Sequence, residues 1–223
     1  MTMSTQSGGA TWALRVHAAC DWVLWSLTMN ALWLVFTLAG GVVLGAAPAA
    51  VAAADLTRRR LRGELFSTMR EFLGVWRREF LRANAVVAPA LAVATLLATR
   101  AIALITAGAA DPASVLVMVA AGFAFTLTAT LVPLYVHYDL PLRRYVIVAS
   151  QWLLRNLAHG VVLLAAGVLI GAASAGLPGL IPLVSIGAWL SLSTALCIAF
   201  FTANDTAVAE QIAPVPATAG KAV

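Results

Sequence analysis

The chain has 223 residues, of which 62% are hydrophobic and 10% are charged. A soluble domain has about 45–50% apolar and about 25% charged residues, so this composition excludes a soluble domain. It predicts an all-α integral membrane protein whose helices form a bundle. A β-barrel is not expected, because its strands would alternate apolar and polar residues. The net charge of +5 does not indicate a nucleic-acid partner, because nearly all of the excess lies beside predicted spans.

Six apolar segments follow one another along the chain. A helix needs about 20 mostly apolar residues to cross the hydrocarbon core. The second segment covers only about 22 Å at 1.5 Å per residue, so it crosses only if the arginines at its end reach back to the headgroups. The sequence therefore predicts five to six transmembrane helices, at residues 22–44, 47–62 (short), 85–106, 113–137, 157–176 and 180–202.

The first apolar segment permits two threadings. It continues too far to be a cleaved signal peptide, so we expect it to stay in the mature protein. One unbroken first helix would place the N-terminus outside, whereas a hairpin that turns within residues 40–48 would place it inside. The glycines and the proline in that stretch favour the hairpin, as do Arg15 and His17 before the span.

Over half of the chain's charges lie in residues 55–84, DLTRRRLRGELFSTMREFLGVWRREFLRAN, which hold eight arginines and four acids. Apolar residues recur there at steps of three and four, the period of an amphipathic helix. We predict an interfacial helix at residues 64–82, separated by Gly63 from the helix before it. Its apolar stripe would lie in the headgroup boundary or pack under the bundle, and consists of Leu65, Met69, Phe72, Leu73, Trp76 and Phe80.

A second basic region, HYDLPLRRYVIVASQWLLRN, follows the fourth segment. We expect Asp139 to cap a helix that begins at Leu140 and has Pro141 in its first turn. Because Lys and Arg favour the cytoplasmic side, both basic regions are predicted to be cytoplasmic and the short links around Asp111 and Pro178 to be outside. The C-terminus is then cytoplasmic, and residues 204–223, which are small, polar and proline-bearing, are predicted to be disordered.

The two basic regions are the candidate contact surface of the protein. One interpretation is an anchor that fixes the topology and binds anionic lipid headgroups of the bilayer. The other is a docking surface for a cytoplasmic partner. The candidate contact residues are Arg58, Arg59, Arg60, Arg62, Arg70, Trp76, Arg77, Arg78, Arg82, Asp139, Arg143, Arg144 and Arg155.

Asn30 is the best candidate for a polar site within the spans. An intramembrane amide most often joins two helices, but it can also line a solute path, so a small-solute channel or transporter is the alternative function. His17, Cys20 and Asp21 lie on one helical face, yet they lack further ligands, so no metal or cofactor is expected. The spans hold no catalytic motif and no pair of carboxylates, so we do not expect an enzyme.

The order of three stretches resembles the YesL-like family, a set of bacterial integral membrane proteins whose defining domain has no assigned function. The stretches are NALWLVFTLAGGVVLGAAPAAVAAADLTRRRLRGE, FLGVWRREFLRAN and PLYVHYDLPLRRYVIVASQWLLRNL. The family's usual proline after the first span is absent here, which leaves the shape of the first turn open. The positions that carry the resemblance are Asn30, Trp33, Pro48, residues 62–64, Phe72, Phe80, Asp139 and Asn156.

The resemblance also implies a role. Members of the YesL-like family are commonly encoded beside carbohydrate ABC importers and glycan-degrading enzymes. This implies an accessory part in sugar uptake at the bacterial cell membrane, with the permease subunits of an ABC importer as partners. No polar and aromatic cluster of the kind that binds a saccharide is recognisable in the predicted spans.

Overall fold

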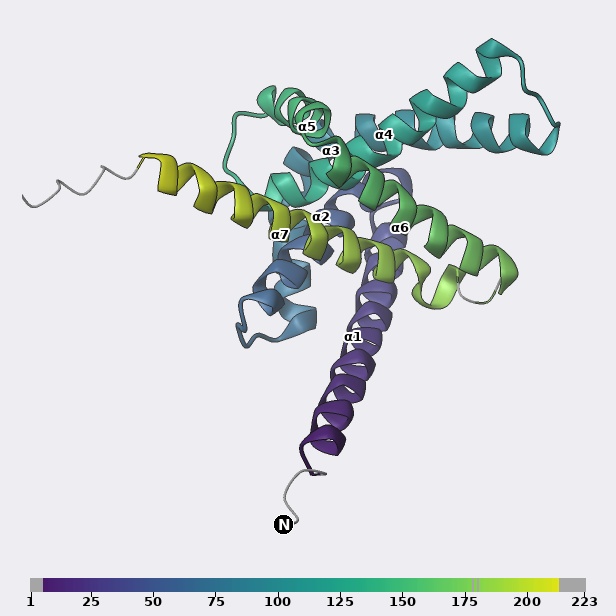
Figure 1. Cartoon of the computed structure of the whole chain (residues 1–223). Helices are drawn as coiled ribbons and strands as arrows, with labels where there is room; N and C mark the ends of the chain where they lie inside the picture. Colours follow the sequence, from purple (N-terminus) through teal and green to yellow (C-terminus); the bar gives the residue numbers. More distant parts are fainter. Residues whose placement is uncertain (1–5, 178, 180, 213–223) are drawn as a thin grey trace, which may run out of the picture.

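The computed structural model describes residues 6–177, 179 and 181–212, and within them it is helical without a strand (Figure 1). This confirms the all-α prediction. α1 stands across the direction of α7 and of the α3–α4 hairpin, so the helices cross at open angles. The elements are α1 (Gln6–Ala39), α2 (Val43–Leu61), α3 (Thr68–Thr106), α4 (Pro112–His137), α5 (Arg144–Arg155), α6 (Leu157–Gly176), the short π-helix η1 (Ile181–Ser185) and α7 (Ile186–Ile212).

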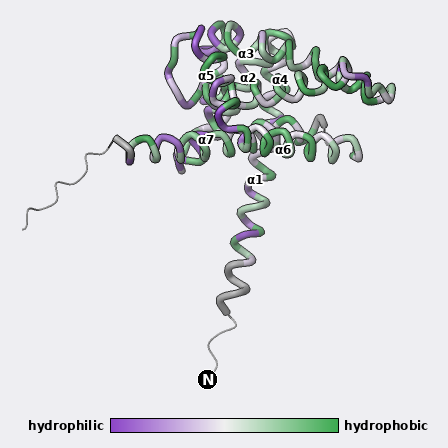
Figure 2. Tube along the Cα trace, turned by 45° about the horizontal axis from the view of Figure 1, so that its top comes forward, coloured by the Kyte–Doolittle hydropathy of each residue, from purple (hydrophilic) through white to green (hydrophobic). Residues whose placement is uncertain are grey.

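Five stretches of helix are long and apolar enough to cross a membrane: Trp12–Ala39, Thr68–Thr106, Pro112–His137, Leu157–Gly176 and Leu183–Glu210. α2 does not meet this description, because its 19 residues include Asp55 and three arginines. Figure 2 shows hydrophobic residues along most of the trace, with hydrophilic ones gathered near α2, α3 and α5. The predicted polytopic membrane protein is confirmed, with five spans by length and composition.

α1 and α2 form the hairpin that the glycines favoured. The turn uses positive φ angles at Gly41 and Val42, and the Val42 amide donates to the Thr37 carbonyl oxygen at 2.8 Å. A Cβ added at Gly45 would lie 2.3 Å from that same oxygen, so only glycine permits this approach of the two helices. The hairpin settles the shape of the first turn without the family's proline.

α2 is the central helix of the molecule. Its alanines leave room for close packing by α1, α3, α4 and α7, and the run of residues 47–54 is buried throughout. The helix begins at Val43 rather than near Pro48, which lies inside it. The short segment is therefore a buried helix in the core of the molecule.

The predicted interfacial helix and the third span are a single helix, α3. Its first half packs along α2, with Phe72 and Val75 buried, whereas its second half pairs with α4. The ring centroid of Phe72 lies 5.0 Å from that of Phe36 in α1. The stripe thus packs under the bundle from Phe72 onward, while Leu65 and Met69 are exposed and residues 64–67 precede the helix.

The C-terminal segment differs from its prediction. α7 continues to Ile212, so residues 204–212 are helical rather than disordered. Asp205 is held by side chains of the α4 end, which gives this segment tertiary contacts. The remainder of the predicted tail, residues 213–223, lies outside the described residues.

Candidate functional site

The two basic regions of the sequence meet at one end of the molecule. The guanidinium of Arg82 in α3 donates to the Asp139 carboxylate and to the Leu140 carbonyl oxygen, both at 3.2 Å. These bonds join α3 to the link between α4 and α5. We call this region, formed by residues 55–82 and 135–145, the charged end. The predicted threading requires this side-by-side placement of the two regions.

Asp139 is not the helix cap that the sequence predicted. α5 begins at Arg144, four residues later than expected, and its N-cap position is Arg143. Tyr145 instead organises the link, because its hydroxyl accepts from the Leu140 amide and donates to the Tyr138 carbonyl oxygen, both at 3.0 Å. The Asp139 carboxylate is thereby left to pair with α3.

α1 joins the charged end through α2. Arg60 donates to the Asp21 carboxylate, and its guanidinium lies over the Trp25 ring, 4.5 Å from the centroid. The Trp25 indole in turn donates to the Thr57 hydroxyl at 3.2 Å. A guanidinium that meets both a carboxylate and an aromatic face is strongly oriented. Arg60 therefore holds the α1–α2 hairpin together rather than pointing to a partner.

Arg59 ties the end of α2 to the start of α3. Its guanidinium donates to Glu64 at 2.9 Å and to Glu71 at 3.0 Å, and it lies 4.7 Å from the Phe66 ring centroid. The hydrogen bond to Glu71, followed by that to Glu64, raises the pKa of Arg59. Gly63, with a φ of 75°, supplies the left-handed turn between the two helices. Like Arg60, Arg59 therefore forms its ion pairs within the protein.

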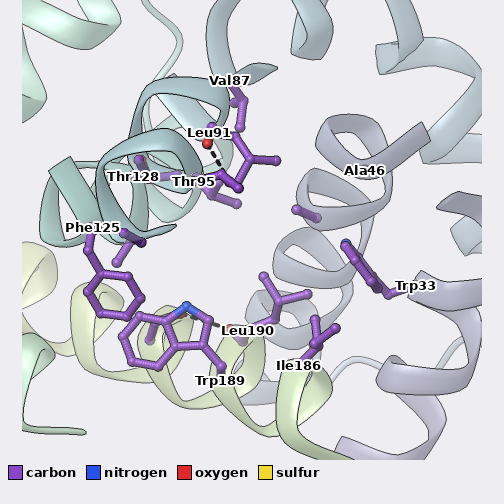
Figure 3. A pocket seen from close by; sticks show the side chains of 16 residues that line it. Trp33, Ala46, Val87, Leu91, Thr95, Phe125, Thr128, Ile186, Trp189 and Leu190 are labelled. Carbon is purple, nitrogen blue, oxygen red and sulfur yellow. Dashed lines mark hydrogen bonds between the residues drawn. The ribbon is translucent and has the colours of Figure 1, made fainter. Parts of the chain in front are cut away.

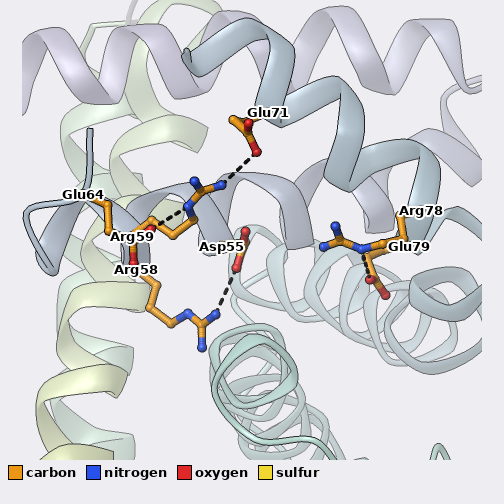
Figure 4. A network of polar contacts seen from close by, with 7 residues as sticks. All are labelled: Asp55, Arg58, Arg59, Glu64, Glu71, Arg78 and Glu79. Carbon is orange, nitrogen blue, oxygen red and sulfur yellow. Dashed lines mark hydrogen bonds and ion pairs between the residues drawn. The ribbon is translucent and has the colours of Figure 1, made fainter. Parts of the chain in front are cut away.

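A polar cavity of ≈ 300 Å³ lies between α2, α3, α4 and the start of α5. Arg58 pairs with Asp55 at 3.2 Å, and Arg78 pairs with Glu79 at 3.0 Å (Figure 4). The second oxygen of Glu79 accepts from the Tyr135 hydroxyl at 2.7 Å. Charged side chains thus line a partly open cavity at the charged end.

α7 reaches the charged end through Asp205. Its carboxylate accepts from the Tyr138 hydroxyl at 2.8 Å and lies 3.3 Å from Nε2 of His137. Burial, followed by the hydrogen bond to Asp205, raises the pKa of Tyr138. Residue 205 belongs to the stretch whose small, polar composition predicted a disordered tail, so the sequence gives no sign of this contact.

The candidate contact residues fall into two groups. Arg58, Arg59, Arg60, Arg78, Arg82 and Asp139 are paired within the protein, and Trp76 packs between Phe36 and Phe80 at centroid distances of 5.5 and 5.0 Å. The others are exposed and form no ion pair within the described part of the chain. We call these the outer arginines: Arg62, Arg70, Arg77, Arg143, Arg144 and Arg155.

Asn30 is buried where α1 meets the start of α7. Its side-chain oxygen accepts from the Gly187 amide at 2.9 Å. A Cβ at Gly187 would lie 2.1 Å from the Ser26 carbonyl oxygen, so the two backbones are in close approach. This is the helix-joining use of an intramembrane amide. A solute path along Asn30 remains a prediction, and this residue does not line the polar cavity.

The structure also pairs two buried residues that the sequence analysis kept apart. The Cys197 sulfur lies 3.6 Å from Nε2 of His159 and 3.7 Å from the Ala129 carbonyl oxygen. No spacing signal connects positions 38 residues apart on different helices. Among the described residues there is no group of three metal-ligating side chains. The helical face with His17, Cys20 and Asp21 has no such group either, and the Asp21 carboxylate forms an ion pair with Arg60.

Comparison with known proteins places this arrangement in a family. A model described as "Protein of unknown function, DUF624" matches residues 27–99. The uncharacterized protein YesV of Bacillus subtilis (strain 168) is 33% identical over 184 residues, which cover 75% of this chain and 82% of YesV. The chain belongs to the DUF624 family. The resemblance to YesL-like proteins is thereby confirmed, and no solved structure matches.

The DUF624 match covers a definite part of the architecture. It runs from the middle of α1 through α2 to the second half of α3. This segment includes the central alanine-rich helix and the arginines of residues 58–82. The family description therefore covers the C-terminal part of α1, all of α2 and most of α3.

Proposed function

We propose that this DUF624 protein is an accessory subunit of a membrane complex and docks on its partner through the outer arginines. The main observation in support is that the six outer arginines are exposed and form no ion pair within the described residues. Neighbouring arginines, by contrast, are paired within the protein. An arginine presents five N–H donors in a planar fork that matches carboxylates. The partner surface is accordingly acidic.

The internal ion pairs support this assignment by making the docking surface rigid. Arg82 fixes the α4–α5 link to α3, and Arg59 fixes the start of α3 to α2. The outer arginines next to them in sequence are thus presented from braced elements. A preorganised surface loses less conformational entropy on association than a mobile one.

The partner that we propose is the permease of a carbohydrate ABC importer in the bacterial cell membrane. This identity is supported by the gene neighbourhoods that the YesL-like resemblance implies. The charged end and the C-terminus then lie on the cytoplasmic side, in agreement with the positive-inside preference. The proposal assigns no catalysis to the chain.

Charge reversal tests the proposal. The variant R77E/R144E should lose the permease during affinity purification from mild detergent and should lower sugar uptake in cells. The control is R100E, at an exposed arginine in the second half of α3, far along the helix from the charged end. Recovery of the wild-type chain alone, with unaltered uptake in R77E/R144E, would refute the docking role.

A further inference from the structure

Two cavities of opposite character lie next to each other along the same helices. Both are formed by α2, α3 and α4. The apolar one, of ≈ 280 Å³, is lined on these helices by Ala50, Val87 and Val132, among others. The polar one, of ≈ 300 Å³, is lined by Val51, Arg82 and Tyr135, among others. These positions differ by at most five residues on each helix, or about 8 Å of helix length.

The apolar cavity is suited to hydrocarbon. Trp33, Phe125 and Trp189 form much of its wall, and the last two rings stack at 4.8 Å (Figure 3). The wall hydroxyls of Thr95 and Thr128 donate to carbonyl oxygens of their own helices at 2.8 Å, so these donors are already used. An apolar cavity of about 150 Å³ already stays dry and binds a benzene-sized molecule, so this larger one has room for several methylenes.

The polar cavity has hydrogen-bond donors to spare. Arg58 uses one N–H on Asp55, and its buried Nε is without a partner. Arg82 bonds the Asp139 carboxylate and the Leu140 carbonyl oxygen through one terminal nitrogen, so its other terminal nitrogen and its Nε keep their N–H groups for a ligand. Each guanidinium carries five N–H groups, so most of these donors can still bond an acceptor-rich group. Phosphate oxygens match this geometry.

We propose that the two cavities together bind one phospholipid. Its phosphate lies at the guanidiniums of Arg58 and Arg82, and one acyl chain enters the apolar cavity between α1, α3, α4 and α7. The arrangement follows the bilayer, because the polar cavity is at the charged end and the apolar one lies between helices that can span the membrane. This site is distinct from the outer arginines, so it stands whether or not an importer docks there.

Lipid retention by the full-length protein tests the site without any variant. Purified protein in detergent is mixed with dioleoyl phosphatidylglycerol, or with dioleoylglycerol, which has the same chains and no phosphate. Native mass spectrometry should detect one retained phospholipid, with a preference of about tenfold over dioleoylglycerol. Equal retention of both, or none of either, would overturn the proposal. Displacement of the lipid by an equal concentration of free glycerol phosphate would also overturn it, because phosphate alone would then suffice.

Paired variants locate the two halves of the site. Ala94→Phe fills the apolar cavity, whereas the control Ala92→Phe adds the same ring at an exposed position of α3. Arg82→Gln removes a phosphate contact, whereas the control Arg77→Gln removes an outer arginine. We expect A94F and R82Q each to lose about tenfold in lipid retention and the controls to match wild type. Equal retention in A94F and A92F, with helical content unchanged by circular dichroism, would exclude a chain in this cavity.

Discussion

The side-chain amide of Asn84 donates a hydrogen bond of 2.8 Å to the carbonyl oxygen of Leu44. Leu44 lies four residues before Pro48, which has no N–H and so cannot bond that oxygen within α2. The same Asn84 amide donates to Phe80 in its own helix at 2.8 Å. Asn84 thus satisfies the carbonyl that the proline frees, and it fixes α3 against the start of the central helix.

The first prediction concerns this bond. Asn84→Ala should lower the free energy of unfolding by about 1–2 kcal/mol, because a carbonyl with little other access to a donor loses its partner. In a Pro48→Ala background the backbone N–H of residue 48 can bond the Leu44 carbonyl oxygen. Asn84→Ala should then lower the free energy of unfolding by about 1 kcal/mol less than it does in the wild type. Denaturant unfolding of the four proteins of this double-mutant cycle measures the difference. Equal costs in both backgrounds would contradict the assignment.

The second prediction concerns the crossing of α1 and α7. Gly187→Ala should destabilise the protein by about 1–3 kcal/mol, since the added Cβ has no room beside Ser26 and Asn30. Gly171→Ala is the control, because a Cβ there meets nothing within 4 Å, and it should stabilise helix α6 by about 0.5–1 kcal/mol. Thermal unfolding in detergent compares the two variants. A smaller loss in G187A than in G171A would contradict the close approach.

The third prediction concerns pH at the start of α4. The Asp111 carboxylate accepts from the hydroxyl and amide of Ser114 and from the amide of Ala113, which lowers its pKa below 3.8. A depressed folded-state pKa means that the cap stabilises above pH 3.8 and is lost as the pH falls through the lower folded value. Amide hydrogen exchange near residue 114 should therefore quicken in acid. In Asp111→Asn this acid dependence should vanish.

The fourth prediction separates paired from outer arginines by stability. Arg59→Ala should lower the free energy of unfolding by about 1 kcal/mol, because two partly exposed ion pairs and a ring contact are lost. Arg62→Ala, at an outer arginine three positions later, should change it by less than about 0.5 kcal/mol. The cost of R59A should also shrink at high salt, where exposed charges are screened. A larger loss of unfolding free energy in R62A than in R59A would contradict the division into paired and outer arginines.

Part of this fold was predictable because its signals are local. The apolar runs gave the helices, and the glycines at 40, 41 and 45 gave the α1–α2 hairpin. The clustering of arginines along the sequence predicted the charged end. These features need only neighbouring residues and a period of 3.6, so one sequence is sufficient to recognise them.

Other features depend on contacts between distant positions. Arg60 and Arg82 seemed free because their acids, Asp21 and Asp139, are 39 and 57 residues away. Asp139 was expected to cap a helix because it precedes Leu140 and a proline. In the structure its carboxylate pairs with Arg82, and the Tyr145 hydroxyl accepts from the Leu140 amide, so no helix begins at Leu140. The local sequence favours a helix cap at Asp139, and only the contact with a distant arginine shows that this carboxylate has another role.

The length of α3 was misjudged for a related reason. The change from a charged to an apolar sequence after residue 84 suggested two elements, an interfacial helix and a span. No residue there stops a helix, and Pro89 is accommodated inside α3. Burial of the Phe72 side against α2 and α1 then makes the first half part of the bundle.

Photo-crosslinking in native membranes tests the docking role most directly. A photoreactive amino acid is placed singly at position 77, 144 or 100 of the full-length chain, and adducts are identified by mass spectrometry. The account predicts an adduct with an importer permease at positions 77 and 144 and none at position 100. Adducts at position 100 alone, or only lipid adducts at 77 and 144, would contradict a protein-docking surface at the charged end.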